Sequence, residues 1–171
     1  MGMKEFVHYL KTEFSTRFIR NYRIGLFVLF ICAGVIANSW WNNANKAESD
    51  YLKSLNLNLA FKIVDIKPTG NHGYGVIYGH VIKSNKPPIY DAIYRDKYTF
   101  CKVKNNKVLF VSPFELVEKN DSLVIQSNLA KYWVYRKSKL IAEYNLTITT
   151  DFFLYSDLEK GKYLDFSTYK N

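Results

Sequence analysis

The chain has 171 residues, of which 48% are hydrophobic and 17% aromatic, and it carries a formal net charge of +9. This composition excludes a disordered tail, because a chain with so many aromatic residues can bury enough apolar surface to fold. Its two cysteines, Cys32 and Cys101, exclude a disulfide-dense secreted scaffold.

Residues 1–23 predict a basic amphipathic segment. Phe6, Val7, Leu10, Phe14 and Phe18 recur at helical spacing, and Lys and Arg residues stand between them. Such a helix lies in the headgroup zone of an anionic leaflet or docks on a partner protein. Both alternatives place this segment beside a membrane.

Residues 24–41 (IGLFVLFICAGVIANSWW) predict a transmembrane helix. These 18 residues carry no formal charge, and a helix of this length spans roughly 27 Å, enough for the hydrocarbon core of a bilayer. We expect the membrane anchor to be bounded by cations at one end and an aromatic belt at the other, formed by Arg20, Arg23, Trp40 and Trp41.

A cleaved signal peptide is the alternative for this segment, because Val35 and Ala37 form an acceptable small-residue cleavage signature. The long and patterned region before residue 24 favours an uncleaved signal anchor instead. Within the span, three small residues could allow another helix to approach closely, and these are Ala33, Gly34 and Ala37.

The charge distribution predicts the orientation. Five basic residues precede the span, whereas the comparable window after it holds only Lys46 and Lys53. Positive charge is retained on the cytoplasmic side. We therefore expect a single-pass protein with a cytoplasmic N-terminus and an extracytoplasmic C-terminal domain, in a bacterial inner membrane facing the periplasm.

Residues 42–54 are polar and predict a juxtamembrane stalk or short helix, and residues 55–171 predict a β-rich domain. Seven to nine strands without crossover helices indicate a small antiparallel β-barrel or β-sandwich. Asn105-Asn106 and Lys137-Ser138 suit two-residue hairpin turns. The expected strands are Leu55–Ile63, Gly73–Lys83, Tyr98–Lys104, Lys107–Ser112, Ser122–Ser127, Lys131–Arg136, Lys139–Thr149, Phe152–Tyr155 and Tyr163–Phe166.

No catalytic, metal or cofactor motif is visible, so we expect no cofactor. Glycines 70, 73, 75 and 79 precede a strand instead of a helix, which favours turns and bulges over a phosphate-binding loop. An envelope hydrolase or transferase is the enzymatic alternative. It would have to combine Cys101, His72, His80 and Asp91, which show no ligand or triad spacing.

Two basic, aromatic hairpins, 95–107 and 131–139, are the candidate partner-binding surface. In a cytoplasmic barrel this mixture would indicate single-stranded nucleic acid. Outside the inner membrane, anionic headgroups, polysaccharide or an acidic protein face fit better, and nucleic acid is not expected. Lysines that keep sheet edges apart explain the same pattern without any ligand. The candidate residues are Arg95, Lys97, Lys102, Lys104, Lys131, Tyr132, Trp133, Tyr135, Arg136 and Lys137.

The sequence therefore predicts a membrane-anchored β-domain that acts by binding, as an accessory or interaction subunit of an envelope complex. Its expected partners are the lipid bilayer and other membrane or envelope proteins.

Overall fold

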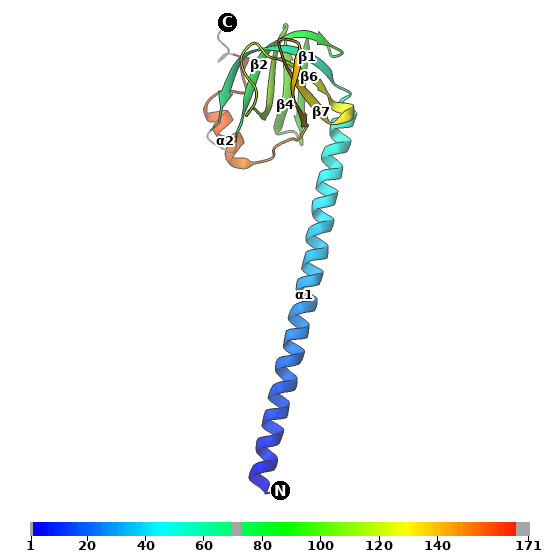
Figure 1. The fold of residues 1–171 in the computed structure, drawn as a ribbon, viewed down its shortest axis with the longest axis vertical. Coiled ribbons are helices and arrows are strands. Elements are labelled where there is room, and N and C mark those ends of the chain that lie inside the picture. Colours follow the sequence, from blue (N-terminus) through cyan, green and yellow to red (C-terminus); the bar gives the residue numbers. More distant parts are fainter. Residues whose placement is uncertain (1, 70–72, 167–171) are drawn as a thin grey trace. The chain divides into compact units, whose positions relative to one another are not determined.

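A computed structural model describes residues 2–69 and 73–166 of the chain (Figure 1). The chain divides into two compact units, Met1–Lys46 and Ala47–Asn171. The long helix α1, Met3–Leu55, accounts for the first unit and contributes its last turns to the second.

Helix α1 contains one candidate membrane span among the described residues, within Ile24–Leu55. Its most apolar stretch is not buried at all, and side chains such as Phe27 and Phe30 are exposed. An exposed apolar surface of this size marks a site of interaction with a membrane or another protein, and by length and composition the helix can cross a bilayer. Trp40 and Trp41 are also exposed, whereas the side chains of Arg20 and Arg23 lie outside the described part of the structure.

The last turns of α1 belong to the β-rich unit. Leu52 is only 1% exposed, and Tyr51 and Leu55 pack against the same core. The Glu48 carboxylate accepts a hydrogen bond from the backbone N–H of Ile148 at 2.7 Å. The segment predicted as a stalk is therefore helical, and its end forms part of the folded domain.

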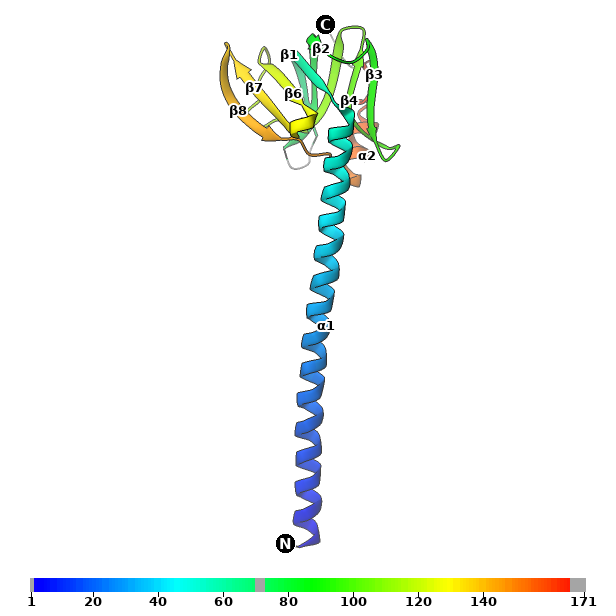
Figure 2. The same ribbon diagram turned by 90° about the vertical axis from the view of Figure 1, so that its right-hand side faces the viewer.

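The domain is built on one antiparallel sheet of eight strands in the order β3-β4-β5-β2-β1-β6-β7-β8. Strands β3 and β8 lie at opposite edges (Figure 2). The predicted mainly-β, antiparallel domain after an apolar helix is confirmed, and the sheet is open, not a closed barrel. The strands are β1 Asn58–Pro68, β2 Tyr74–Ser84, β3 Ile89–Tyr94, β4 Tyr98–Lys104, β5 Lys107–Pro113, β6 Ser122–Gln126, β7 Lys131–Arg136 and β8 Lys139–Asn145.

The inner face of the sheet carries the main core. The alternation predicted for the first strand holds, because Leu59, Phe61 and Ile63 are at most 1% exposed. The Phe110 ring lies at the centre and makes edge-to-face contacts, 5.4–6.4 Å between centroids. Such aromatic pairs add stability beyond the area they bury. The rings around Phe110 are Phe61, Phe100 and Tyr132.

Helix α2, Phe152–Lys160, covers part of the outer face of the sheet. Its Leu154, Tyr155 and Leu158 pack on outward side chains of β2 and β5, and the Tyr155 hydroxyl donates to the carbonyl of Thr99 at 2.6 Å. Asp151 caps the helix, because its carboxylate accepts from the backbone N–H groups of residues 153 and 154. The predicted strands Phe152–Tyr155 and Tyr163–Phe166 are therefore wrong.

Two further differences concern the strands. The strand β3, which follows Pro87-Pro88, was not predicted, because its six residues are too few for a clear pattern. The predicted turns at Asn105-Asn106 and Lys137-Ser138 are confirmed, with positive φ at all four residues. Arg95 and Asp96 also have positive φ, in the three-residue connection between β3 and β4.

Candidate functional site

The outer face of the sheet has a covered half and an open half. Over β2 and β5, Val76, Tyr78, Leu109 and Val111 are at most 3% exposed beneath α2. Val64 of β1 still packs against the cluster beneath α2. Beyond it, no element within residues 2–69 and 73–166 packs on the outward side chains of β1, β6, β7 and β8. We call this half the open face, and its residues are Ala60, Lys62, Lys83, Ser122, Val124, Trp133, Tyr135, Leu140, Ile141 and Glu143.

Strand register places these side chains in rows. Residues on these strands alternate between the buried inner face and the outer face. One row runs across the sheet through Lys83, Ala60, Val124, Trp133 and Glu143. The neighbouring row runs through Lys62, Ser122, Tyr135 and Leu140. The two rows cross β2, β1, β6, β7 and β8 and build one surface with aromatic rings towards β8.

A polar contact fixes the Trp133 ring on this surface. Its indole Nε1–H donates to Oε2 of Glu143 at 2.8 Å, and the Lys131 ammonium binds the other oxygen of the same carboxylate. The hydrogen bond from Lys131 is the main cause that lowers the pKa of Glu143, and the bond from Trp133 adds to it. Glu143 is therefore ionised at neutral pH and already has its partners.

The β7–β8 hairpin adds exposed apolar and basic side chains at the edge. Leu140 is 54% exposed and Ile141 42%, and both follow the turn formed by Lys137 and Ser138. Lys137 and Lys139 are exposed, and neither forms an ion pair with another described residue. This edge of the open face is therefore apolar next to the strand and positive at the turn.

The first basic hairpin of the predicted surface lies elsewhere. Strands β2, β1 and β6 separate the β4–β5 hairpin from the β7–β8 hairpin. Arg95 and Lys97 lie over the rings of Tyr94 and Tyr98, at 5.0 and 5.5 Å from the centroids, and Lys102 pairs with Asp91 at 3.2 Å. Lys104 is exposed.

Two residues of the second hairpin differ from the sequence interpretation. Tyr132 is fully buried, and its hydroxyl accepts from Ser112 at 3.0 Å, so it is a core residue and not part of a surface. Arg136 forms a bidentate contact with Asp121, both bonds at 3.0 Å. Its guanidinium also pairs with Glu118 at 2.9 Å. Sheet pairing thus brings acids from other segments to bases that seemed unopposed along the sequence.

The described residues of the enzymatic alternative, Cys101, His80 and Asp91, do not form a reactive centre. Cys101 is fully buried in the core, and burial, followed by the nearby Asp91 carboxylate, raises the pKa of its thiol. A nucleophilic cysteine requires the opposite, an accessible thiol with a lowered pKa. His80 is exposed on β2, and His72 lies outside the described residues. No cluster of potential metal ligands occurs in the described part of the chain.

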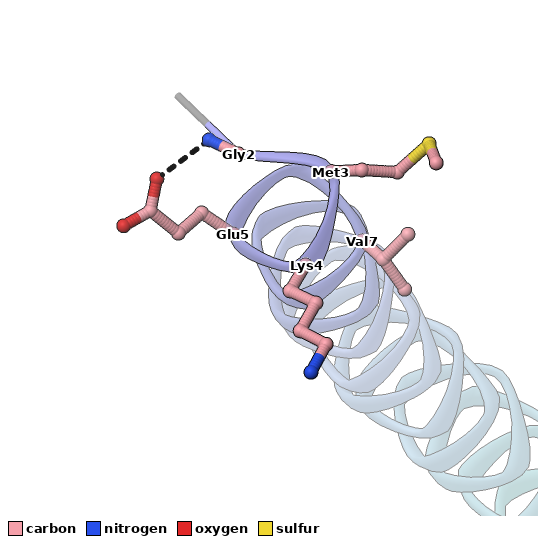
Figure 3. Close-up of a pocket in the computed structure, with 5 residues that line it drawn as sticks. All are labelled: Gly2, Met3, Lys4, Glu5 and Val7. Carbon is pink, nitrogen blue, oxygen red and sulfur yellow. Dashed lines mark hydrogen bonds between the residues drawn. The ribbon is translucent and has the colours of Figure 1, made fainter.

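A shallow hollow lies along the first turns of α1 (Figure 3). Met3 and Val7 line one side, and the Glu5 carboxylate turns back to accept from the backbone N–H of Gly2 at 2.9 Å. Lys4 points away from both. These side chains diverge from the helix, so the hollow offers no convergent set of polar groups for a ligand.

Comparison of the chain with protein-family models, with curated proteins and with solved structures gives no match. The interpretation of the open face therefore rests on its geometry alone. Sequence reasoning identified Trp133 and Tyr135 but missed Ala60, Val124 and Glu143 as their neighbours. The outward positions of each strand were readable from its alternation, but the register that joins the strands was not.

Proposed function

We propose that this protein is a single-pass membrane protein whose β-domain binds an acidic face of another envelope protein, as an accessory subunit of a membrane complex. The observation that carries this proposal is the open face. One half of the outer sheet is sealed by α2, whereas the half that holds Trp133 and Tyr135 is covered by no described element.

The composition of the open face favours a protein partner. Interfaces are enriched in Trp and Tyr at their centre and surrounded by a polar rim. Here Trp133 pairs across the sheet with Val124, which in turn pairs with Ala60, and Tyr135 pairs with Ser122. Large rings next to smaller side chains on a hydrogen-bonded sheet offer a preformed surface for docking.

The charges of the open face favour an acidic partner. Lys62 and Lys83 are exposed, and neither has an ion pair within the described ranges. Glu143, the acidic residue of this face, is already neutralised by Lys131. Complementary charge would raise the association rate and select against basic partners.

The cytoplasmic N-terminus and the extracytoplasmic β-domain are part of the proposal. They rest on the charge asymmetry around the span, five basic residues before it against Lys46 and Lys53 after it. A reporter fused to the C-terminus tests this placement. Activity confined to the cytoplasm would reverse the orientation and would make nucleic acid the partner to examine.

Site-specific photocrosslinking of the full-length protein in its own membrane tests the docking face. A crosslinker at Tyr135 is expected to give a discrete protein adduct that Trp133→Ala diminishes. The matched control is a crosslinker at Phe153, which is 71% exposed on α2 and should give no such adduct. Equal adducts from both positions, or a protein that runs alone as a monomer after mild extraction, would contradict the proposal.

A further inference from the structure

Strand β8 ends the sheet, and one row of its backbone groups has no hydrogen-bond partner among residues 2–69 and 73–166. The backbone N–H of Leu146 donates to the carbonyl of Ala130 at 2.8 Å just beyond the strand. In an antiparallel ladder, hydrogen-bonded pairs alternate with pairs whose N–H and C=O point away. The pairs of Tyr144 and Ala142 with β7 are therefore hydrogen-bonded, and the N–H and C=O groups of Glu143 and Asn145 point to the free edge.

Each edge strand of the sheet carries a bulge, which in β3 lies at the register shift between Ala92 and Ile93. Pro87-Pro88 precede β3, and the Pro88 carbonyl accepts from the backbone N–H of Asn105 at 3.1 Å, which extends the pairing of β3 with β4. Strand β8 contains no proline. Its register shift at Ile141 marks a bulge that interrupts its first half, and bulges of this kind blunt an edge. The second half, Ala142–Asn145, is regular and open.

The charges at this edge distinguish between possible occupants. A second copy of β8, paired antiparallel, brings the two Glu143 carboxylates opposite each other in the register centred on that residue. In the register centred on Tyr144, Glu143 faces Asn145. Neither register supplies an anion for Lys137 and Lys139. Self-pairing therefore leaves the charge of Lys137 and Lys139 unmatched, and a second copy is the less favoured occupant.

We propose that the free edge of β8 takes up an extended segment of the acidic partner, which adds to the sheet as a ninth strand. Main-chain hydrogen bonds to Glu143 and Asn145 supply affinity in this mode of recognition, and side-chain contacts supply specificity. The added segment is apolar beside Leu140 and Ile141 and acidic beside Lys137 and Lys139. This inference rests on the proposed function, because it names how a partner of the open face is held.

Amide hydrogen exchange on the full-length protein in lipid nanodiscs tests strand addition. The probe is a synthetic peptide with two Asp residues followed by alternating Thr and Val, and the control peptide has two Lys residues in their place. The acidic peptide is expected to slow exchange at the amides of Glu143 and Asn145. The basic peptide should bind about tenfold more weakly, the effect of one favourable ionic contact replaced by repulsion.

Asn145→Pro and Asn145→Ala form a matched pair. Proline removes the N–H that faces the free edge without removing a bond to β7, whereas alanine removes only the side chain. Loss of one backbone hydrogen bond is expected to weaken peptide binding about fivefold in the proline variant alone. Equal binding by both variants, absence of protection by the acidic peptide, or protection that rises with protein concentration without peptide would each overturn strand addition.

The two proposals fail separately. A Tyr135 crosslink that persists in Asn145→Pro keeps the docking face and overturns the added strand. A Tyr135 crosslink that is absent from the wild-type protein overturns the docking face, whatever the exchange data show. A crosslink lost in Asn145→Pro but kept in Asn145→Ala supports both.

Discussion

The two halves of the outer sheet surface share strand type and a common inner core, yet only one half is covered. In the covered half, continuous apolar runs such as Val76–Tyr78 and Val108–Val111 bury side chains on both faces. In the open half, buried and polar residues alternate along β1, β6 and β7. A continuous apolar run indicates a strand buried on both faces, and alternation indicates one buried face. The polarity of the outward side chains thus determines which part of the outer face α2 covers and which part stays open.

The largest expected effect tests the covered half. Leu158→Ala removes a fully buried side chain of α2 and should lower the free energy of unfolding by about 2–5 kcal/mol through lost burial and a cavity. Val124→Ala in the open half removes a partly exposed side chain and should cost about 0.5–1 kcal/mol. Chemical denaturation of the full-length protein in detergent measures both, and equal costs would contradict the distinction between the halves.

The next prediction compares hydrogen bonds to a charged carboxylate with a hydrogen bond between neutral groups. Asp121 is 2% exposed and accepts two hydrogen bonds from Arg136 beside the open half, whereas Tyr155 donates one to Thr99 beneath α2. Asp121→Asn should cost about 1.5–3 kcal/mol, because bonds to charged groups are the stronger ones, and Tyr155→Phe about 0.5–1.5 kcal/mol. The same denaturation assay decides, and a larger loss for Tyr155→Phe would reverse the order.

A smaller effect compares the hairpin turns of the two halves. Ser138 in the β7–β8 turn has φ 65°, and Asn106 in the β4–β5 turn has φ 68°. Glycine removes the strain of this left-handed conformation, so Ser138→Gly should raise the free energy of unfolding by about 0.5 kcal/mol. Asn106→Gly should change little, since Asn tolerates positive φ. If Asn106→Gly raised the free energy of unfolding more than Ser138→Gly, the β7–β8 turn would not be the more strained of the two.

The strands were predictable where local pattern and turn chemistry agreed. Tyr98–Lys104 and Lys131–Arg136 were located to the residue, because positive-φ turns bound one end of each. The first half of the C-terminal helix was mistaken for the strand Phe152–Tyr155, since Leu154 and Tyr155 are also compatible with a short apolar strand. The Asp151 cap distinguishes the two, and a capping residue becomes informative only once a helix is considered.

The open face was predictable only in part, for a different reason. Trp133 and Tyr135 are conspicuous within one strand, but Ala60 and Val124 become their neighbours only through sheet register. Charge was misjudged in the same way. Lys131 and Arg136 seemed to be unopposed, whereas sheet pairing brings Glu143 and Asp121 to them. The local sequence gives the charge of each side chain. The net charge of the surface also depends on which side chains sheet pairing brings together.

The smallest effect concerns how the open face responds to pH. The Glu143 carboxylate that holds Trp133 has a lowered pKa, so its contact is complete above the ordinary value of about 4.3 and is lost as the pH falls through the lower folded value. In the covered half, burial raises the pKa of Tyr155, so its hydroxyl stays protonated over this pH range and keeps its bond to the carbonyl of Thr99. With Trp40 and Trp41 replaced by Phe, the fluorescence of Trp133 should change with a midpoint below that of an ordinary glutamate. Glu143→Gln should remove the transition, and a midpoint at or above about 4.3 would show that the carboxylate does not hold the ring in solution.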